Sequence, residues 1–266
     1  MSEILIERRD GGAFVTFNRP ESRNALNTNM VDAIAALIAS IDDDPEVRYL
    51  VFQGAGGHFS AGGDMEAFGQ SLQLSSDERR ASFEGRIRHN GKCFLLLEAL
   101  QKPVISLVRG AAAGAGLSFV LASDFVFAAE DAMFIFAQPR VGLSLDLSLT
   151  YHLPRVVGPK IARQLALTGA MLDADGARLK GIVDEIHPHD KLADALASLV
   201  KRFGGVAPRA AGRSKWLVSG SDRRSLDDQI EQEALALGAC AVEPDFDEGV
   251  QSFLQKRRAA FTGKVV

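Results

Sequence analysis

Two segments rich in glycine and alanine constrain this sequence most. They are Gly-Gly-His-Phe-Ser-Ala-Gly-Gly-Asp at residues 56–64 and Arg-Gly-Ala-Ala-Ala-Gly-Ala-Gly-Leu at residues 109–117. Each follows an apolar run that predicts a buried strand, at residues 49–52 and 103–108, and each precedes a stretch that can be helical. Small residues at such a junction leave backbone N–H groups uncovered and let a ligand approach them. Two junctions facing one site would therefore offer two donors to a developing oxyanion.

Length and composition are those of an ordinary globular protein. The 266 residues suit one large domain, or one domain with a helical appendage. With 24% charged residues and a net charge of -4, the chain gives no reason to expect a nucleic-acid partner. No apolar run approaches the ~18 residues of a membrane span, and charges occupy the N-terminus where a signal peptide needs an apolar core. We therefore expect no membrane association and a cytoplasmic location.

Hydrophobic patterning divides the chain into two parts. The N-terminal part alternates strands and helices, with a β-hairpin over residues 4–18, a helix from Thr28 to about Asp43 and a longer helix over residues 78–100. Between these helices, the polar stretch Gln70–Asp77 is expected to be a mobile loop. From Leu153 onward the pattern is mostly helical. Patterning alone thus predicts a mixed α/β core with a helical tail.

Short motifs along nearly the whole chain carry a more specific signal. In order they are Asn18-Arg19-Pro20, Asn24-Ala25-Leu26, Phe59-Ser60-Ala61-Gly62-Gly63-Asp64, Pro103-Val104-Ile105, Ala113-Gly114-Ala115-Gly116, Leu153-Pro154-Arg155 and Leu165-Ala166-Leu167-Thr168-Gly169. Each motif is weak alone, but their joint order and spacing are specific. The chain resembles the crotonase superfamily, which is the enoyl-CoA hydratase/isomerase family.

The resemblance implies a fold, an assembly and a substrate class. The fold is α/β, a crotonase (ClpP-like) spiral of ββα units with a C-terminal helical trimerisation region. Residues 1–200 would form the spiral core with the CoA site and the active site, and residues 201–266 the trimerisation region. The expected partners are acyl-CoA thioesters and copies of the same chain, as a homotrimer or a hexamer. Coenzyme A would enter as part of the substrate, with no separate cofactor and no metal.

Two backbone N–H groups hold the thioester carbonyl in this family, and the matching positions here are Gly63 and Ala115. Preorganised donors in a dry site stabilise the negative charge that enolisation places on the carbonyl oxygen. Ala115 also opens an apolar helical stretch, so the positive end of the helix dipole would add to the effect. The alternative is that both segments are tight turns that need small residues only for space.

The acid groups depart from the hydratase pattern. Hydratases of this family position a water with two glutamates, whose counterparts here are Ser118 and Gln138, or Arg140 if the alignment shifts by two. None of these is a carboxylate, and Ser118 is a poor general base. Conventional water addition is therefore not favoured.

Asp146 falls instead where isomerase members carry their acid, among them the ring-1,2-epoxyphenylacetyl-CoA isomerases. The match is partial, since Leu145 and Ser148 replace the usual proline and glycine. Asp146 would take a proton alpha or gamma to the thioester and return it to another carbon. Its leucine-rich surroundings should raise its pKa and make it a better base. The structural alternative is that Asp146 is a helix N-cap.

The resemblance also predicts residues that contact the substrate, including the segment that contacts the CoA nucleotide. These are Arg23, Ala25, Ala61, Asp64, Gly114, Ser118 and Gln138. Near the C-terminus, Lys256, Arg257 and Lys264 either reach a CoA phosphate or are solvated charges of the tail.

Several other functions stay open. The first is hydration of a 2-enoyl-CoA, and the second is non-catalytic binding of acyl-CoA. A serine hydrolase could use Ser118, His152 and Asp146, although no Gly-x-Ser-x-Gly motif occurs. A dehalogenase branch of the family pairs the aspartate with a histidine, but the counterpart here is Leu95.

Overall fold

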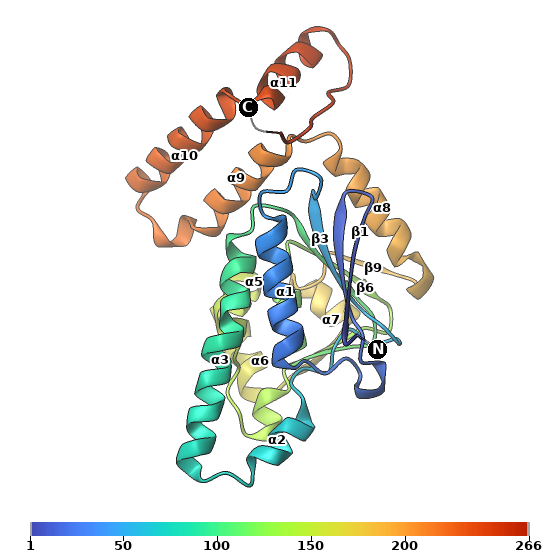
Figure 1. Cartoon of the computed structure of the whole chain (residues 1–266), viewed down its shortest axis with the longest axis vertical. Helices are drawn as coiled ribbons and strands as arrows, with labels where there is room; N and C mark the ends of the chain where they lie inside the picture. The colour runs from blue at the N-terminus through green and yellow to red at the C-terminus, as the bar shows by residue number, and fades with distance from the viewer. Residues whose placement is uncertain (1, 265–266) are drawn as a thin grey trace.

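The strands of the chain are divided between two sheets in the computed structural model, which describes residues 2–264 (Figure 1). The larger sheet has the order β1-β2-β3-β4-β6-β9 and the smaller one the order β5-β7-β8. In chain order the strands are β1 (Ile4–Arg9), β2 (Gly12–Phe17), β3 (Tyr49–Gly54), β4 (Val104–Val108), β5 (Ala111–Ala113), β6 (Phe125–Ala129), β7 (Met133–Ile135), β8 (Met171–Asp173) and β9 (Glu185–His187).

Helices cover these sheets and form the C-terminal part. They are α1 (Thr28–Ile41), α2 (Met65–Ser71), α3 (Ser76–Ala99), α4 (Ala115–Leu121), α5 (Leu149–Val157), α6 (Pro159–Thr168), α7 (Ala174–Leu179), α8 (Leu192–Phe203), α9 (Pro208–Ser219), α10 (Leu226–Ala241) and α11 (Pro244–Leu254). Short 3-10 turns lie at η1 (Pro20–Ser22), η2 (Gln138–Val141), η3 (His189–Lys191) and η4 (Ser221–Arg223).

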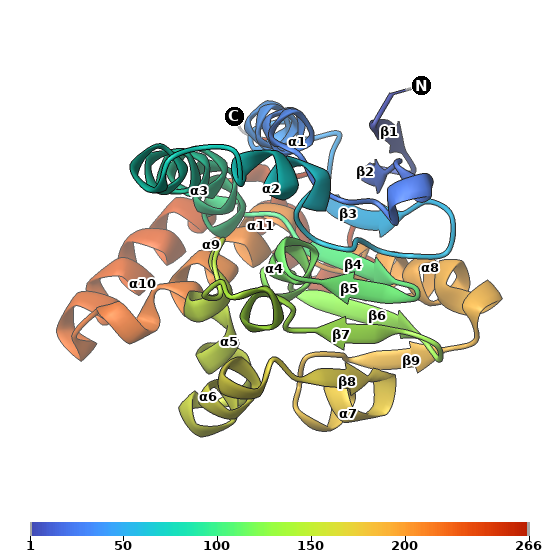
Figure 2. The same ribbon diagram turned by 90° about the horizontal axis from the view of Figure 1, so that it is seen from below.

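From β4 to β7, successive strands alternate between the two sheets, so the chain winds as a spiral. After β4 joins the larger sheet, β5 joins the smaller one, and β6 and β7 repeat this step. Apart from the β1–β2 hairpin, all strand pairs of the larger sheet are parallel. The two sheets lie side by side in Figure 2. The α/β spiral expected from the resemblance is thus confirmed.

The central strands β3 and β4 of the larger sheet are buried on both faces, as their continuous apolar sequences predict. Leu50 and Phe52 of β3 belong to a core that also contains residues of α1, α3 and α4. Val51, between them, belongs to a second core with α8. Because side chains pack against both faces of β3 and β4, packing fixes the backbone positions at which the two glycine-rich segments begin.

Helices occupy both ends of the polar stretch at residues 70–77, so the loop expected there is shortened to residues 72–75. α2 reaches Ser71, and α3 begins at Ser76 after a capping box formed by Ser75 and Glu78. The reciprocal hydrogen bonds of this box satisfy backbone groups that a helix start leaves unpaired. Only a short connection separates the two helices.

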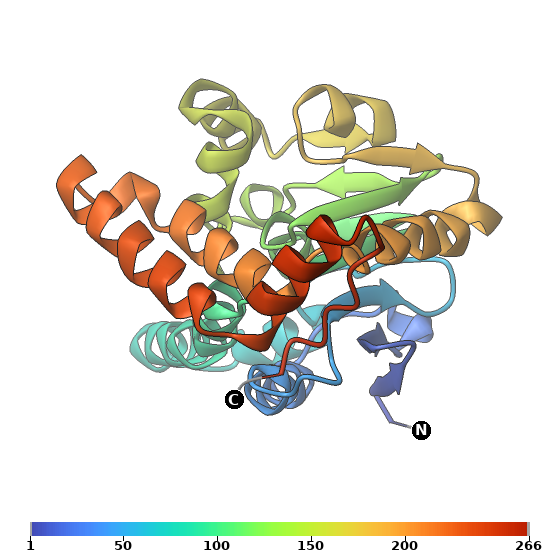
Figure 3. The ribbon, with the colours of Figure 1, turned by 90° about the horizontal axis from the view of Figure 1, so that it is seen from above.

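The last helices, α9 to α11, extend away from the sheets (Figures 1 and 3). The helical tail expected after the core is therefore present, although α8 runs across residue 200 to Phe203. Several large apolar side chains of these helices are exposed: Val218, Leu226, Leu237, Phe253 and Leu254. None of the helices in residues 2–264 is long and apolar enough to span a bilayer.

Candidate active site

A cavity of about 210 Å³ lies where the two glycine-rich segments meet α2, α3 and the segment that carries Gln138 and Asp146. The predicted site residues that line it are Ala61, Gly63, Asp64, Gly114, Ala115, Gln138 and Asp146. A larger cavity of about 410 Å³ lies beside α8 and α9. Its charged lining residues include Asp124 and Lys215, which form an ion pair with each other at 2.6 Å. We therefore place the chemistry in the smaller cavity.

Backbone pairing brings the two glycine-rich segments together. Ser60 accepts a hydrogen bond from the N–H of Ala113 at 2.9 Å and donates its own N–H to Ala111 at 3.0 Å. A Cβ atom on Gly62 would lie 2.8 Å from the carbonyl oxygen of Ala113, and one on Gly116 would lie 2.6 Å from the Cβ of Ser60. Glycine at 62 and 116 is therefore required for close packing, in agreement with the alternative that both segments need small residues for space.

Gly63 and Ala115 face the cavity with their backbone N–H groups uncommitted. In residues 2–264 neither N–H donates a hydrogen bond to the protein. Ala115 is the first residue of α4, and Gly114 before it has φ 49° and ψ -122°, a conformation open to glycine. The same segments thus combine close packing with two donors that are unused within residues 2–264.

Asp146 lies in the cavity wall and does not cap a helix. Its Oδ1 accepts a hydrogen bond from Nε2 of Gln138 at 3.0 Å. The N-cap of α5 is Ser148, which makes no capping side-chain bond, so the N-cap interpretation of Asp146 was wrong. Leu147 and Ser148 have φ values of 45° and 69°, so the chain turns through two left-handed residues directly after the carboxylate. Such conformations are costly for residues with a side chain and are concentrated at functional sites.

Burial raises the pKa of Asp146 above its usual range. The hydrogen bond from Gln138, the positive charge of Arg86 and the backbone N–H of Asp146 itself lower the pKa and offset part of this effect. Because desolvation disfavours the charged form, the carboxylate binds a proton more tightly than an exposed one. The predicted direction of the pKa shift is thus confirmed, and the shift suits a base for carbon acids.

The helices α2 and α3 contribute cavity residues that the sequence analysis missed. The guanidinium carbon of Arg86 lies 4.5 Å from the ring centre of Phe68 and 4.3 Å from that of Phe83. Asn90 lies on the same side of α3 and also lines the cavity. The first half of α3 is too polar to show an apolar face, so its residue pattern does not predict which side chains point inward.

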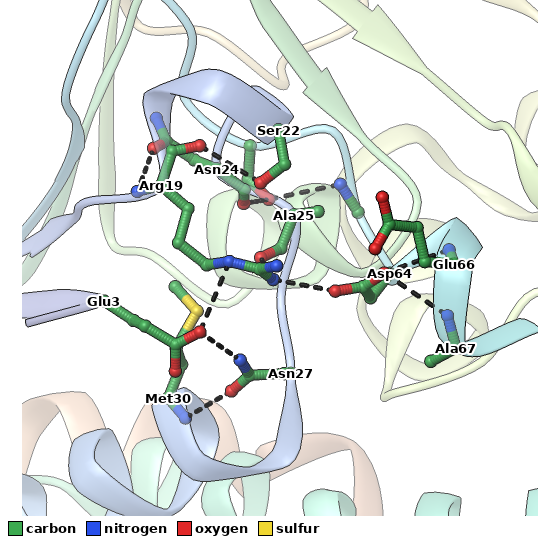
Figure 4. Close-up of polar contacts among 12 residues, drawn as sticks. Glu3, Arg19, Ser22, Asn24, Ala25, Asn27, Met30, Asp64, Glu66 and Ala67 are labelled. Atoms are coloured by element: carbon green, nitrogen blue, oxygen red, sulfur yellow. Dashed lines mark hydrogen bonds and ion pairs between the residues drawn. The ribbon is translucent and has the colours of Figure 1, made fainter.

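Asp64 lines the cavity, but its carboxylate is engaged in holding the fold (Figure 4). One oxygen accepts a hydrogen bond from Arg19 at 2.9 Å, and the other accepts from the backbone of Glu66 and Ala67 at the start of α2. Burial would raise the pKa of Asp64, but these hydrogen bonds and the charge of Arg19 lower it below its usual value. The carboxylate is thus tied to the protein rather than exposed to a ligand.

Three predicted substrate-binding residues do not line the cavity: Arg23, Ala25 and Ser118. Arg23 is exposed, and its carbonyl oxygen accepts a hydrogen bond from the N–H of Ala61 at 2.8 Å. Ser118 is fully buried, and its hydroxyl has no hydrogen-bond partner within residues 2–264. The contact of the Arg23–Ala25 segment with the CoA nucleotide stays a prediction.

The structure does not fit the hypotheses of a serine hydrolase or a dehalogenase. The hydroxyl of Ser118 makes no hydrogen bond to His152 in the described part of the chain. His152 lines a separate cavity between α3 and α5, and burial, aided by the charge of Arg155, lowers its pKa to about 4. Leu95, the expected counterpart of the dehalogenase histidine, is 72% exposed. Ser118, His152 and Asp146 therefore do not form a catalytic triad in the described residues.

Comparison with known proteins agrees with this geometry. The family described as enoyl-CoA hydratase/isomerase matches residues 7–264. A crotonyl-CoA hydratase of Syntrophomonas wolfei is 34% identical over 98% of both chains, and a 1,2-epoxyphenylacetyl-CoA isomerase of Escherichia coli is 32% identical over 99% of this chain and 100% of that protein. A putative enoyl-CoA hydratase from Streptomyces coelicolor A3(2) superposes with a TM-score of 0.90 at 30% identity, over 99% of this chain and 95% of that one. The chain therefore belongs to the enoyl-CoA hydratase/isomerase family.

Proposed function

We propose that the protein is an acyl-CoA isomerase that shifts a double bond in an enoyl-CoA thioester. One observation carries this proposal: a half-buried carboxylate, Asp146, shares a cavity with the two uncommitted N–H groups, while the other carboxylate of the described lining, Asp64, is bound to Arg19. The counterparts of the hydratase acids are Ser118 and Gln138, which are not carboxylates. Ser118 also does not line the cavity.

In the proposed reaction, Asp146 removes a proton from the carbon alpha to the thioester of a 3-enoyl-CoA. The electron pair of that C–H bond moves toward the carbonyl, and the N–H groups of Gly63 and Ala115 stabilise the resulting oxyanion. Asp146 then gives the proton to the gamma carbon, and the double bond ends between the alpha and beta carbons. Gln138 holds one oxygen of the carboxylate and so orients it. No water and no redox partner is consumed.

Hydration of a 2-enoyl-CoA is the second candidate. It is supported by the similarity to the crotonyl-CoA hydratase and by the side-chain oxygen of Gln138, which is buried without a partner in residues 2–264. That oxygen could accept a hydrogen bond from a water molecule that Asp146 activates. Non-catalytic binding of acyl-CoA is the third candidate.

The purified protein should be tested with a 3-enoyl-CoA and with a 2-enoyl-CoA, and the products separated by chromatography. We expect conversion of the first to its 2-enoyl isomer and almost no 3-hydroxyacyl-CoA from the second. Rapid formation of the hydroxyacyl product, with little isomerisation, would instead identify a hydratase. If neither reaction occurs, calorimetry with a saturated acyl-CoA separates a binding protein from one that does not recognise the thioester.

We further propose that the chain forms a homotrimer or a hexamer and acts in the cytoplasm. Exposed apolar residues on α10 and α11, including Leu237 and Phe253, support self-association. Large exposed apolar surfaces on a soluble protein commonly mark interfaces between chains. Arg257 is bound to Glu248 at 2.6 Å, which favours a solvated tail charge over a phosphate contact.

A further inference from the structure

Two polar side chains of α3 face the cavity without a partner from the protein. Arg86 and Asn90 are four residues apart, so they lie on one face of the helix. Both line the cavity, and Asn90 is only 7% exposed. Within residues 2–264, Oδ1 of Asn90 has no hydrogen-bond partner and Arg86 makes neither a hydrogen bond nor an ion pair.

Unpaired polar groups at a buried site cost free energy unless a ligand satisfies them. The aromatic rings of Phe68 and Phe83 hold the guanidinium of Arg86 without using its hydrogen bonds. A guanidinium above a ring face is attracted by the π electrons, while its N–H groups still point outward in its own plane. The donors of Arg86 are therefore fixed in place and available.

The position of the pair indicates which part of a substrate it would meet. Gly63 and Ala115 hold the thioester carbonyl in the proposed reaction, and Asp146 faces the neighbouring carbons. The rest of the acyl group then lies against the remaining wall of the cavity, which includes Arg86 and Asn90 on α3. The pair is thus placed to contact the acyl group and not the thioester.

The charges of the cavity favour a neutral group. The carboxylate of Asp64 is neutralised by Arg19, at 2.9 Å. The other charged residues in the described lining are Asp146 and Arg86, which have opposite charges. A carboxylate on the acyl group would add a second negative charge near Asp146. A neutral oxygen would leave the charges of Asp146 and Arg86 equal and opposite.

We propose that the cavity selects acyl-CoA thioesters whose acyl group carries a neutral oxygen, as a hydroxyl, ether or carbonyl, bound by Arg86 and Asn90. This selectivity rests on the acyl-CoA binding of the proposed function but not on the type of reaction. It distinguishes oxygenated acyl groups from plain hydrocarbon chains of the same length.

The test is calorimetric binding of saturated thioesters, which have no double bond to move and therefore report recognition without turnover. The ligands are hexanoyl-CoA, the same thioester with a hydroxyl at C4, C5 or C6, and the C6 dicarboxylic monothioester. We expect at least one hydroxylated thioester to bind about tenfold more tightly than hexanoyl-CoA, as a charged hydrogen bond provides. Arg86→Met and Asn90→Leu should each reduce this preference to about twofold or less.

Arg88→Met is the matched control, because Arg88 is exposed and paired with Glu84 on the same helix. It should keep the full preference. The wild-type comparison needs no variant: equal or tighter binding of hexanoyl-CoA would overturn the proposal, and so would tightest binding of the dicarboxylic thioester. If the hydroxylated thioesters are preferred but no 3-enoyl-CoA is isomerised, the selectivity stands and the proposed reaction fails.

Discussion

At the scale of single residues, Asp146 is half-buried, and its polar neighbours offset only part of the effect of burial on its pKa. Burial raises its pKa, while Gln138 and Arg86 keep the charged form accessible. A base must be ionised to accept a proton, so activity should rise with pH as the carboxylate loses its proton. The pH dependence of the reaction therefore reports this environment directly.

The acid limb of the kcat/KM profile should lie above 3.8, the ordinary pKa of an aspartate. Arg86→Met removes a positive charge that lowers the pKa of Asp146, so this limb should move to higher pH. Arg88→Met, on the solvent side of α3, should leave the limb unchanged. An acid limb at or below the ordinary value in the wild-type protein would show that Asp146 is not the titrating base.

The N–H group of Ala115 can be removed by proline, which has no backbone donor. Ala115 is the first residue of α4, a position where proline is tolerated. Ala115→Pro should lower kcat/KM by about 10² to 10³, the usual cost of losing one such donor. Thermal unfolding of the variant checks that the fold is kept.

The control is Leu226→Pro, at the first residue of α10 and 74% exposed. It makes the same backbone change away from the cavity and should leave activity close to that of the wild type. Full activity in Ala115→Pro would mean that the thioester carbonyl is held elsewhere.

At the scale of secondary-structure elements, the loop after β3 and helix α2 meet at Gly63. A Cβ atom there would lie 2.8 Å from Cζ of Phe68. Gly63→Ala should therefore displace the ring or the loop and reduce activity by about tenfold or more, since overpacking commonly costs 1–3 kcal/mol. The double variant Gly63→Ala/Phe68→Leu should recover part of that loss.

Gly69→Ala, on the same helix α2, is the control because nothing lies within 4 Å of the added atom. It should retain activity and slightly raise stability, since alanine favours helix over glycine. A double variant no more active than Gly63→Ala would show that the contact with Phe68 is not what limits the loop.

The sequence predicted the main elements because their signals are local. Apolar runs identified β3 and β4, and the apolar face of α1 identified that helix, although it ends at Ile41 and not near Asp43. The strands β5 and β8 have three residues each, too few for a pattern, and are defined by pairing with β7. α2 was missed because its seven residues include a glycine and lack an apolar repeat.

The sequence predicted the site residues only where a suitable residue type stands at a position that the family resemblance marks. Gly63 and Ala115 belong to motifs whose order along the chain is specific, and Asp146 lies where isomerases of the family carry their acid. The structure brings the three residues to one cavity. Arg86 and Asn90 reach that cavity only because α3 packs over it, a tertiary relation with no signal in the local sequence. Ser118 shows the converse, since its position in the motif suggested a substrate contact that the described lining lacks.

At the scale of the whole molecule, the helices α9 to α11 form a group at one end of the core (Figure 1). Large apolar side chains on these helices are exposed. Light scattering after size-exclusion chromatography should find a trimer or a hexamer. Phe253→Glu places a charge on a side chain that is 83% exposed, and it should shift the protein toward monomers if that surface is an interface. Leu5→Glu, at 41% exposure on the edge strand β1, should leave the assembly intact. A monomeric wild-type protein would contradict the predicted assembly.

The central claim is that one carboxylate moves the proton, and the Asp146→Asn variant tests it most directly. The raised pKa means that folding favours protonated Asp146, so above that pKa the ionised group reduces stability, and protonation at lower pH removes this cost. Asparagine carries no charge, so the unfolding temperature at neutral pH should not fall. The decisive measurement is the rate of conversion of a 3-enoyl-CoA to its 2-enoyl isomer by the folded variant. We predict a loss of at least about 10²-fold, and a rate close to that of the wild type would contradict the single-carboxylate mechanism.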